Sequence, residues 1–311
     1  MLDMLTFRSC RAALLVLALS GSAGSLAYAQ DTAEVEATRR AAVLAQLPGD
    51  AAKRLFGVAE SPAAGTADSI GSYTKGCLIG GVQLPADGPN WQVMRPSRHR
   101  AWGHPMLISF IERLAAAMPQ TNGWPGLLIG DLAQPRGGPM LTGHASHQLG
   151  IEADIWLTPM PERRLSREER DEMPAINLVA ADGLDVDPNV WTPAYRKLLE
   201  AAAKQPGVAR IFVNAAIKRA LCREAGSDRA WLSRIRPWWG HNYHFHLRLS
   251  CPAGDSPCEN QAPPPPGDGC GKELDWWFTP KALHPPPPPP RIAALPIAAM
   301  PPACRAVAAQ R

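Results

Sequence analysis

The sequence predicts an α+β fold: a small antiparallel β-sheet core flanked by helices and by loops that disulfides tie together. Strand-like and helix-like segments alternate irregularly, without the regular strand–helix–strand order of a parallel sheet. Residues 151–156 and 243–249 alternate apolar and polar side chains, which is typical of half-buried strands. Six cysteines follow residue 30, an even number that suits disulfides.

The N-terminus has the features of a cleaved signal peptide over residues 1–29. Arg8 and Arg11 precede an apolar run at 12–19, and residues 27–29 (Ala-Tyr-Ala) fit an A-x-A cleavage site. The apolar run is far too short to span a bilayer. We therefore expect secretion into an oxidising compartment and no stable membrane insertion after cleavage.

Beyond the signal peptide, composition divides the chain into three parts. Residues 30–67 are rich in alanine and predict an N-terminal arm. Residues 68–282 hold the alternating strands and helices and form the expected main domain. Residues 283–311 form a proline-rich C-terminal tail, where six consecutive prolines favour a stiff polyproline segment outside any packed core.

Hydrophobic periodicity predicts the elements of the main domain in turn. Residues 104–118, "HPMLISFIERLAAAM", have apolar side chains at helical spacing and predict a core helix. Residues 124–132, "WPGLLIGDL", predict a strand. A helix that starts at a proline follows at 193–205, and residues 209–222 predict a strand that runs into a helix.

The charge of the chain gives no sign of a nucleic-acid partner. The net charge is +4, and acidic and basic residues are interspersed, as in "ERRLSREERDE". No RNA-binding, zinc-finger or basic-arm pattern is present in the sequence. We therefore predict no nucleic-acid binding, and the sequence alone predicts no oligomeric state.

Five of the eight histidines lie in "GHASHQLGIEADIW" (143–156) and "GHNYHFHLRL" (240–249). His244 and His246 are two residues apart, so on a strand both point to the same face. A turn at Gly150 followed by a strand can bring Asp154 back beside His147. Three ligands from two strands, with a fourth position left for water, are typical of a catalytic zinc site.

Other readings of these histidines fit less well. The H-E-x-x-H motif is absent, because "HASH" has neither the spacing nor the glutamate. A non-haem iron site usually has its first histidine two residues from the carboxylate, whereas six residues separate His147 from Asp154. A set of ordinary, satisfied histidines is the remaining alternative, and the clustering beside an acid disfavours it.

Six segments of the chain together resemble one known family. They are "SIGSYTKGCLIGG", "QVMRPSRHRAWGHP", "GHASHQLGIEADIW", "RIFVNAAIK", "RPWWGHNYHFHLRLSCP" and "GDGCGKEL". The family is that of the penicillin-insensitive murein endopeptidases, and the resemblance covers about residues 68–280. These enzymes belong to a wider group of zinc peptidases that includes lysostaphin-type enzymes and D-Ala-D-Ala carboxypeptidases. The resemblance makes residues 68–282 the expected zinc peptidase domain.

The resemblance implies a set of site residues. His147, Asp154 and His246 are implied as ligands of one Zn²⁺ per chain. His244, the first histidine of H-x-H, is implied as a catalytic or transition-state-stabilising residue, with His241 also at the site.

The resemblance also implies a second metal position in some members of the group. In this chain His144 would help to bind that metal, with Asp182 and Asp185 as its partners. Relatives can have a histidine at the last of these positions, so Asp185 is a departure from their pattern.

Cysteine spacing alone suggests one local bridge, Cys251–Cys258, out of fifteen ways to pair six cysteines. The order of the cysteines in the resembling family implies the full set. The implied pairs are Cys77–Cys304, Cys222–Cys270 and Cys251–Cys258.

The implied function is that of a periplasmic zinc endopeptidase, insensitive to penicillin, which hydrolyses D-alanyl–meso-diaminopimelyl cross-links in peptidoglycan. Ser146 lacks the sequence context of a serine nucleophile. Two alternatives stay open. A zinc D,D-carboxypeptidase acting on stem peptides would need a cation for the terminal carboxylate, for which Arg234, Arg236 or Arg248 could serve. A non-catalytic cell-wall-binding zinc module is disfavoured by the presence of both His241 and His244.

Overall fold

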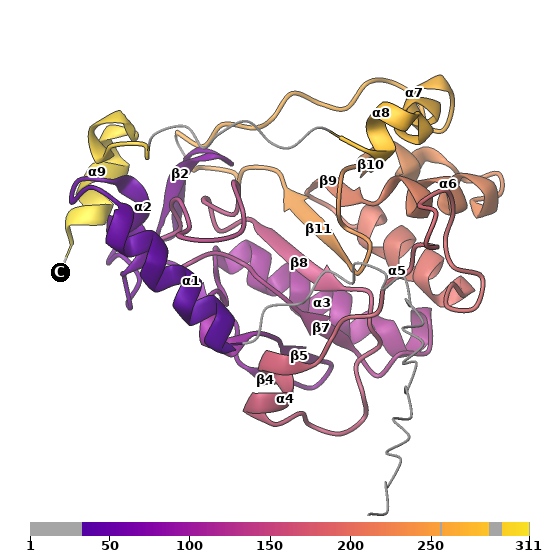
Figure 1. Cartoon of the computed structure of the whole chain (residues 1–311), viewed down its shortest axis with the longest axis horizontal. Helices are drawn as coiled ribbons and strands as arrows, with labels where there is room; N and C mark the ends of the chain where they lie inside the picture. Colours follow the sequence, from indigo (N-terminus) through magenta and orange to yellow (C-terminus); the bar gives the residue numbers. More distant parts are fainter. Residues whose placement is uncertain (1–32, 256, 286–293, 311) are drawn as a thin grey trace, which may run out of the picture.

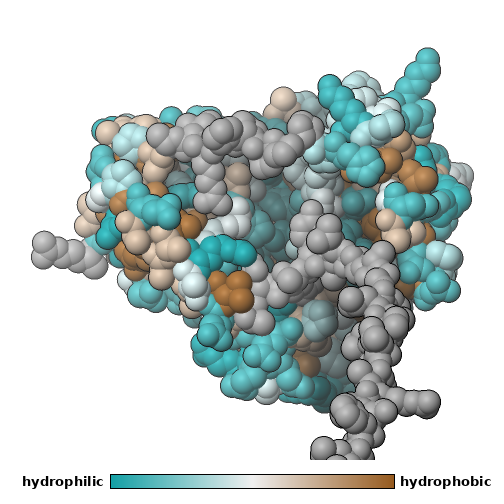
Figure 2. All heavy atoms as spheres, in the orientation of Figure 1, coloured by the Kyte–Doolittle hydropathy of each residue, from teal (hydrophilic) through white to brown (hydrophobic). Residues whose placement is uncertain are grey.

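The computed structural model describes residues 33–255, 257–285 and 294–310, and it confirms the predicted α+β class. The predicted signal peptide at residues 1–29 lies outside this range. Among the described residues, none of the helices has the length and apolar character needed to cross a bilayer. On the face drawn in Figure 2, hydrophobic residues occur in small groups among hydrophilic ones.

A seven-stranded mixed sheet organises the main domain (Figure 1). Its central pairs, β9–β11, β11–β8 and β8–β7, are antiparallel as predicted. The parallel pairs β10–β9 and β5–β7 extend it beyond the small antiparallel sheet that the sequence predicts. In spatial order the strands are β10 (Ile235–Pro237), β9 (Val208–Val213), β11 (His244–Leu249), β8 (Glu152–Trp156), β7 (Leu127–Ile129), β5 (Trp91–Val93) and β4 (Asp87–Gly88).

Two small two-stranded sheets and several helices complete the described structure. The additional strand pairs are β1 (Asp68–Ser72) with β2 (Lys75–Ile79) and β3 (Val82–Gln83) with β6 (Trp102–Gly103). The α-helices are α1 (Ala33–Gln46), α2 (Ala52–Gly57), α3 (Pro105–Thr121), α4 (Arg167–Glu172), α5 (Pro193–Lys204), α6 (Ala215–Glu224), α7 (Lys272–Asp275), α8 (Pro280–Leu283) and α9 (Pro302–Ala309). Short 3₁₀ turns are η1 (Pro96–Arg98), η2 (Ala230–Arg234), η3 (Trp276–Phe278) and η4 (Ile297–Ala299).

The elements predicted from periodicity are present. The helix expected at 104–118 is α3, which starts at Pro105. Nδ1 of His104 accepts the backbone N–H of Met106 and so caps the first turn of this helix. The strand expected at 124–132 is β7, and the helix at 193–205 is α5. The strand and helix expected at 209–222 are β9 and α6.

The two faces of the sheet have opposite character, because successive side chains of a strand point to opposite sides. The apolar side chains of β8 and β11 join the main core with α3, α5 and α6; they are Ala153, Ile155, Phe245, Leu247 and Leu249. The other face carries the polar side chains of the same strands, which are Glu152, Asp154, His244, His246 and Arg248. One apolar face therefore supports the sheet, and the other presents the candidate site.

Parts of the predicted arm and tail meet on the β1–β2 hairpin. Phe56 of α2 and Val307 of α9 are buried in one cluster with Ile70 of β1. Figure 1 shows α9 beside α2 at the edge of the molecule. These contacts tie residues 52–57 and 302–309 to the main domain, while the boundaries at 30–67, 68–282 and 283–311 stay predictions.

Three disulfides join distant and local segments. They link the same pairs that the resemblance implies: Cys77–Cys304, Cys222–Cys270 and Cys251–Cys258. The first bridge joins β2 to α9 inside the cluster that contains Phe56, Ile70 and Val307, where both cysteines are fully buried.

We predict that replacing Cys77 and Cys304 together by alanine lowers the free energy of unfolding by about 2–5 kcal/mol. This bridge spans a sequence separation of 227 residues, so its loss frees a large loop in the unfolded chain. Urea denaturation measures the change. The matched control is the double replacement of Cys251 and Cys258, whose separation is only 7 residues. An equal loss in the control would contradict the loop-closure explanation.

Candidate metal centre

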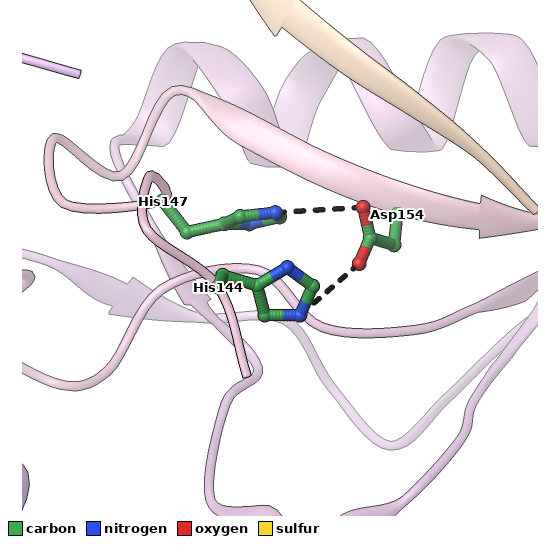
Figure 3. Close-up of side chains that lie close together, drawn as sticks. All are labelled: His144, His147 and Asp154. Atoms are coloured by element: carbon green, nitrogen blue, oxygen red, sulfur yellow. Dashed lines mark ion pairs between the residues drawn. The ribbon is translucent and has the colours of Figure 1, made fainter. Parts of the chain in front are cut away.

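The candidate site is built from one loop and two neighbouring strands. His144 and His147 lie on the loop before β8, and both imidazoles point toward Asp154 on β8 (Figure 3). One ligand atom from each of these three residues lies within 4.8 Å of the others. His246 faces the same carboxylate from β11, since the strand register places it opposite Asp154.

The three predicted zinc ligands are brought together with similar spacings. Nε2 of His147 lies 3.0 Å from Nδ1 of His246 and 3.4 Å from Oδ1 of Asp154. Nδ1 of His246 lies 3.2 Å from the same carboxylate oxygen. Ligands held at about 2.0–2.1 Å by a tetrahedral zinc lie roughly 3.3–3.4 Å from one another. The two nitrogens and the oxygen therefore have the mutual spacing of three corners of such a site.

His144 adds a further imidazole on the other carboxylate oxygen. Its Nε2 lies 3.3 Å from Oδ2 of Asp154 and 3.1 Å from Oδ2 of Asp131. Asp131 is buried and also pairs with Arg98 and Arg100. Burial alone would raise the pKa of Asp131, but the charges of the two arginines and the hydrogen bond to His144 hold it well below its ordinary value.

The residues predicted to share a second metal with His144 make other contacts. The Asp185 carboxylate pairs with Arg223 at 2.8 Å, and Oδ1 of Asp182 accepts the Leu184 N–H at 2.9 Å. Within the described part of the chain, no hydrogen bond or ion pair joins either acid to His144. The second metal position stays a prediction.

Glu152 accepts hydrogen bonds from two of the predicted ligands. Its Oε2 accepts the backbone N–H of His147 at 2.6 Å, and its Oε1 accepts Nε2–H of His246 at 2.8 Å and Nε–H of Arg248 at 2.7 Å. Burial alone would raise the pKa of Glu152, but the hydrogen bond and charge of His246 and the charge of Arg248 lower it to about 2. Because Nε2 of His246 is engaged, Nδ1 is the nitrogen that faces the ligand group.

The sequence analysis missed the role of Glu152 as a site residue. The available signal was the strand alternation, which places Glu152 on the same face as Asp154. The sequence analysis also missed Asp131. This residue lies two positions after the end of β7 and is part of no local sequence motif that indicates a site.

Charge coupling dominates the centre of the site. Burial alone would raise the pKa of Asp154, but the imidazoles of His244, His144 and His147 hold it well below its ordinary value. Burial alone would lower the pKa of His246, yet hydrogen bonds to Asp154 and Glu152 raise it to about 9. The site therefore combines ionised carboxylates with closely packed imidazoles.

His244 and His241 lie beside the ligand group. Nε2 of His244 is 3.7 Å from Oδ1 of Asp154, and its buried Nδ1 has no hydrogen-bond partner among the described residues. Nδ1–H of His241 donates to the Trp239 carbonyl at 2.9 Å, and its ring lies 5.0 Å from that of His244. Burial lowers the pKa of His244 to about 4; burial and the neighbouring imidazoles of His244 and His246 lower that of His241 to about 3.

The backbone is unusual at two of these histidines. His147 has φ of 65° and His241 has φ of 54°, in the left-handed region that non-glycine residues seldom adopt. Such conformations require support from the surrounding structure and concentrate at functional sites. The turn predicted at Gly150 is also left-handed, with φ of 70°, and an added Cβ there would lie 2.5 Å from a Leu78 methyl group.

A pocket of about 250 Å³ opens over Asp154 and His244. Its walls combine the candidate metal centre with a cluster of charged side chains. They include Glu36, Arg39, Arg95, Arg98, Arg100, Asp131, Thr142, His144, Asp154, Trp156, Tyr243 and His244.

Comparisons with known proteins point to one family. A family model described as penicillin-insensitive murein endopeptidase matches residues 69–309. A protein of that name from Klebsiella pneumoniae is 48% identical over 219 residues, which are 70% of this chain and 79% of the relative. One from Yersinia enterocolitica is 47% identical over 246 residues, 79% and 87% of the two chains. One from Haemophilus influenzae is 51% identical over 216 residues, 70% and 75% of the two chains.

We predict that Glu152→Gln lowers the free energy of unfolding of chelator-treated protein by about 3–5 kcal/mol, because it leaves the buried Arg248 guanidinium without its charged partner. Urea denaturation monitored by tryptophan fluorescence measures this change. The control is Glu162→Gln at an exposed position, which should stay within about 0.5 kcal/mol of the parent. Equal stability of the two variants would contradict the conclusion that Glu152 stabilises the site by pairing with Arg248.

Proposed function

The chain belongs to the penicillin-insensitive murein endopeptidase family, and from that premise we propose that it is a zinc-dependent peptidase of peptidoglycan cross-links. The observation that carries the proposal is the convergence of His147, Asp154 and His246, whose facing ligand atoms are 3.0–3.4 Å apart. All three residues lie inside the segment that matches the family model.

The chemistry of the donors fits Zn²⁺. Two imidazole nitrogens and one carboxylate oxygen are a common protein ligand set for a catalytic zinc, which keeps one further position for water or substrate. A zinc ion held there would polarise the scissile carbonyl and lower the pKa of a bound water. We assign one zinc per chain to this set, with Glu152 orienting His246 through its Nε2–H.

His244 and His241 are the proposed catalytic residues. Both are neutral imidazoles near pH 7, because their pKa values are lowered to about 4 and about 3. A neutral imidazole can accept a proton from the attacking water or donate its N–H to the developing oxyanion. His244 is favoured for direct contact with the reacting atoms, since its Nε2 lies 3.7 Å from Oδ1 of Asp154 and it lines the pocket over that carboxylate.

The proposed substrate is the D-alanyl–meso-diaminopimelyl cross-link, cleaved in the periplasm after removal of the predicted signal peptide. The names of the relatives support a murein substrate, and these relatives are bacterial proteins. Insensitivity to penicillin follows from this mechanism, because the mechanism uses no nucleophilic serine that a β-lactam could acylate.

The carboxypeptidase alternative needs a cation for the terminal carboxylate of a stem peptide. The three arginines predicted for that task bind other groups in the structure. Arg234 donates to the Ala203 carbonyl, Arg236 pairs with Glu273, and Arg248 pairs with Glu152. The endopeptidase assignment is preferred because the matching family model and the relatives carry that description. A non-catalytic zinc module would give His241 and His244 no role.

We predict that the purified mature protein converts cross-linked muropeptide dimers to monomers. A chelator should abolish the activity and added Zn²⁺ should restore it, whereas benzylpenicillin should leave it unchanged. Separation of the products by liquid chromatography and mass spectrometry measures all three effects. Shortening of free stem peptides with intact dimers would support the carboxypeptidase, and no change in either substrate would support the binding module.

We further predict that His244→Ala and His246→Ala fail in different ways. His246→Ala should lose both zinc and activity, because a ligand is removed. His244→Ala should keep zinc near one ion per chain and lose dimer cleavage by about 10²–10⁴-fold. Metal analysis beside the rate assay separates the two outcomes, with the exposed His284→Ala as control. Zinc loss in His244→Ala with retention in His246→Ala would reverse the two roles.

A further inference from the structure

Helix α1 is attached to the molecule in an unusual way. A surface helix normally buries an apolar stripe against the core. Of the fourteen residues of α1, the buried one is an acid, Glu36, which is 4% exposed. No residue of α1 belongs to the three hydrophobic clusters found in the described part of the chain. Glu36 therefore takes the place that an apolar anchor would ordinarily have.

The Glu36 carboxylate sits in a site that is built for an anion. Its Oε1 lies 3.3 Å from Nη2 of Arg100 and also accepts a short hydrogen bond from the Thr142 hydroxyl. The same Arg100 nitrogen donates to the Thr142 hydroxyl at 2.7 Å. The Arg100 side chain is 2% exposed, so this guanidinium is a fixed and largely desolvated partner.

This anion site is continuous with the candidate metal centre. Nη1 of Arg100 pairs with Asp131 at 2.9 Å, and Asp131 contacts His144 at 3.1 Å. Glu36 and Asp154 line the same pocket. The pocket volume of about 250 Å³ is below the ~300–1,000 Å³ usual for small-molecule sites, and α1 supplies part of its wall.

Polar contacts with the neighbouring segment also hold α1. Nη2 of Arg40 donates to the Gly57 carbonyl at 3.0 Å, and Nη1 of Arg54 donates to the Leu44 carbonyl at 2.7 Å. The family match begins at residue 69, so α1 lies outside the part of the chain that resembles the family model. A helix without an apolar anchor can detach at a small free-energy cost, since local opening is easiest where few apolar contacts are lost.

We propose that Arg100 and Thr142 form a carboxylate-binding subsite for the peptide substrate, and that Glu36 of α1 occupies it as an intramolecular competitor. The inference rests on the proposed function, which supplies a peptide with free carboxylates as substrate. Exchange of one carboxylate for another keeps Arg100 paired, whereas simple loss of Glu36 would leave one side of this buried cation unsatisfied. The subsite contacts one carboxylate oxygen, through Nη2 of Arg100 and the Thr142 hydroxyl.

A purely structural ion pair makes a different prediction. If Glu36 only stabilised the fold, Glu36→Gln would lower the unfolding temperature and leave ligand affinity unchanged. If Glu36 competes with the substrate, the same variant binds carboxylate ligands more tightly, because the open state of the subsite becomes more populated. Glu34→Gln, on an exposed position of the same helix, is the matched control.

The probe is N-acetyl-D-alanine, with its uncharged amide as the second ligand. We expect N-acetyl-D-alanine to bind Glu36→Gln about tenfold more tightly than the parent and Glu34→Gln, as measured by calorimetry. The amide should show no such difference. In the parent, the carboxylate should also speed hydrogen exchange of the backbone amides of residues 33–46. Equal affinity in all three proteins, or no binding to Glu36→Gln, would overturn the proposal.

The binding test does not depend on hydrolysis, so its result can be interpreted even if the protein proves not to be a peptidase. The cleavage assay gives the complementary readout. If dimers are cleaved, Glu36→Gln should lower KM by a similar factor with kcat nearly unchanged. Active enzyme with the same KM in Glu36→Gln and Glu34→Gln would refute the competitor role while leaving the peptidase assignment intact.

Discussion

The antiparallel register between β8 and β11 places His246 opposite Asp154 and Arg248 opposite Glu152, and the candidate metal centre depends on this pairing. Directly opposite residues on one sheet face are close enough to contact one another. A shift of β11 by one residue against β8 would turn His246 and Arg248 to the other face, away from Asp154 and Glu152. The apolar residues between them, Ala153 and Leu247, are buried in the core and oppose such a shift.

The polar face of this sheet is also buried, so its charges have to satisfy one another. Glu152 binds His246 and Arg248, and Asp131 binds Arg98 and Arg100. An unpaired charge in such a place is strongly destabilising, whereas a complete network holds its members in fixed positions. Glu152 also accepts the backbone N–H of His147, and this hydrogen bond helps to hold the loop at His147 in its positive-φ conformation.

The sequence predicted much of this arrangement from local patterns. Alternation located β8 and β11, and the spacing of His244 and His246 placed both on one strand face. The parallel strand pairs were not predicted, because short strands such as β5 and β7 contain only three residues each and have no distinct period. The contact of Glu152 with Arg248 spans 96 residues, and that of Glu36 with Arg100 spans 64. Contacts of this kind follow from strand order and helix docking, for which a single sequence holds no local signal.

The central claim is that one zinc ion binds between His147, Asp154 and His246, and X-ray diffraction recorded on both sides of the zinc absorption edge tests it most directly. The account predicts one strong anomalous peak per chain, about 2.0–2.2 Å from Nε2 of His147, Nδ1 of His246 and a carboxylate oxygen of Asp154. A zinc-loaded, active crystal in which the peak lies elsewhere, or in which one of these three residues is not a ligand, would contradict it.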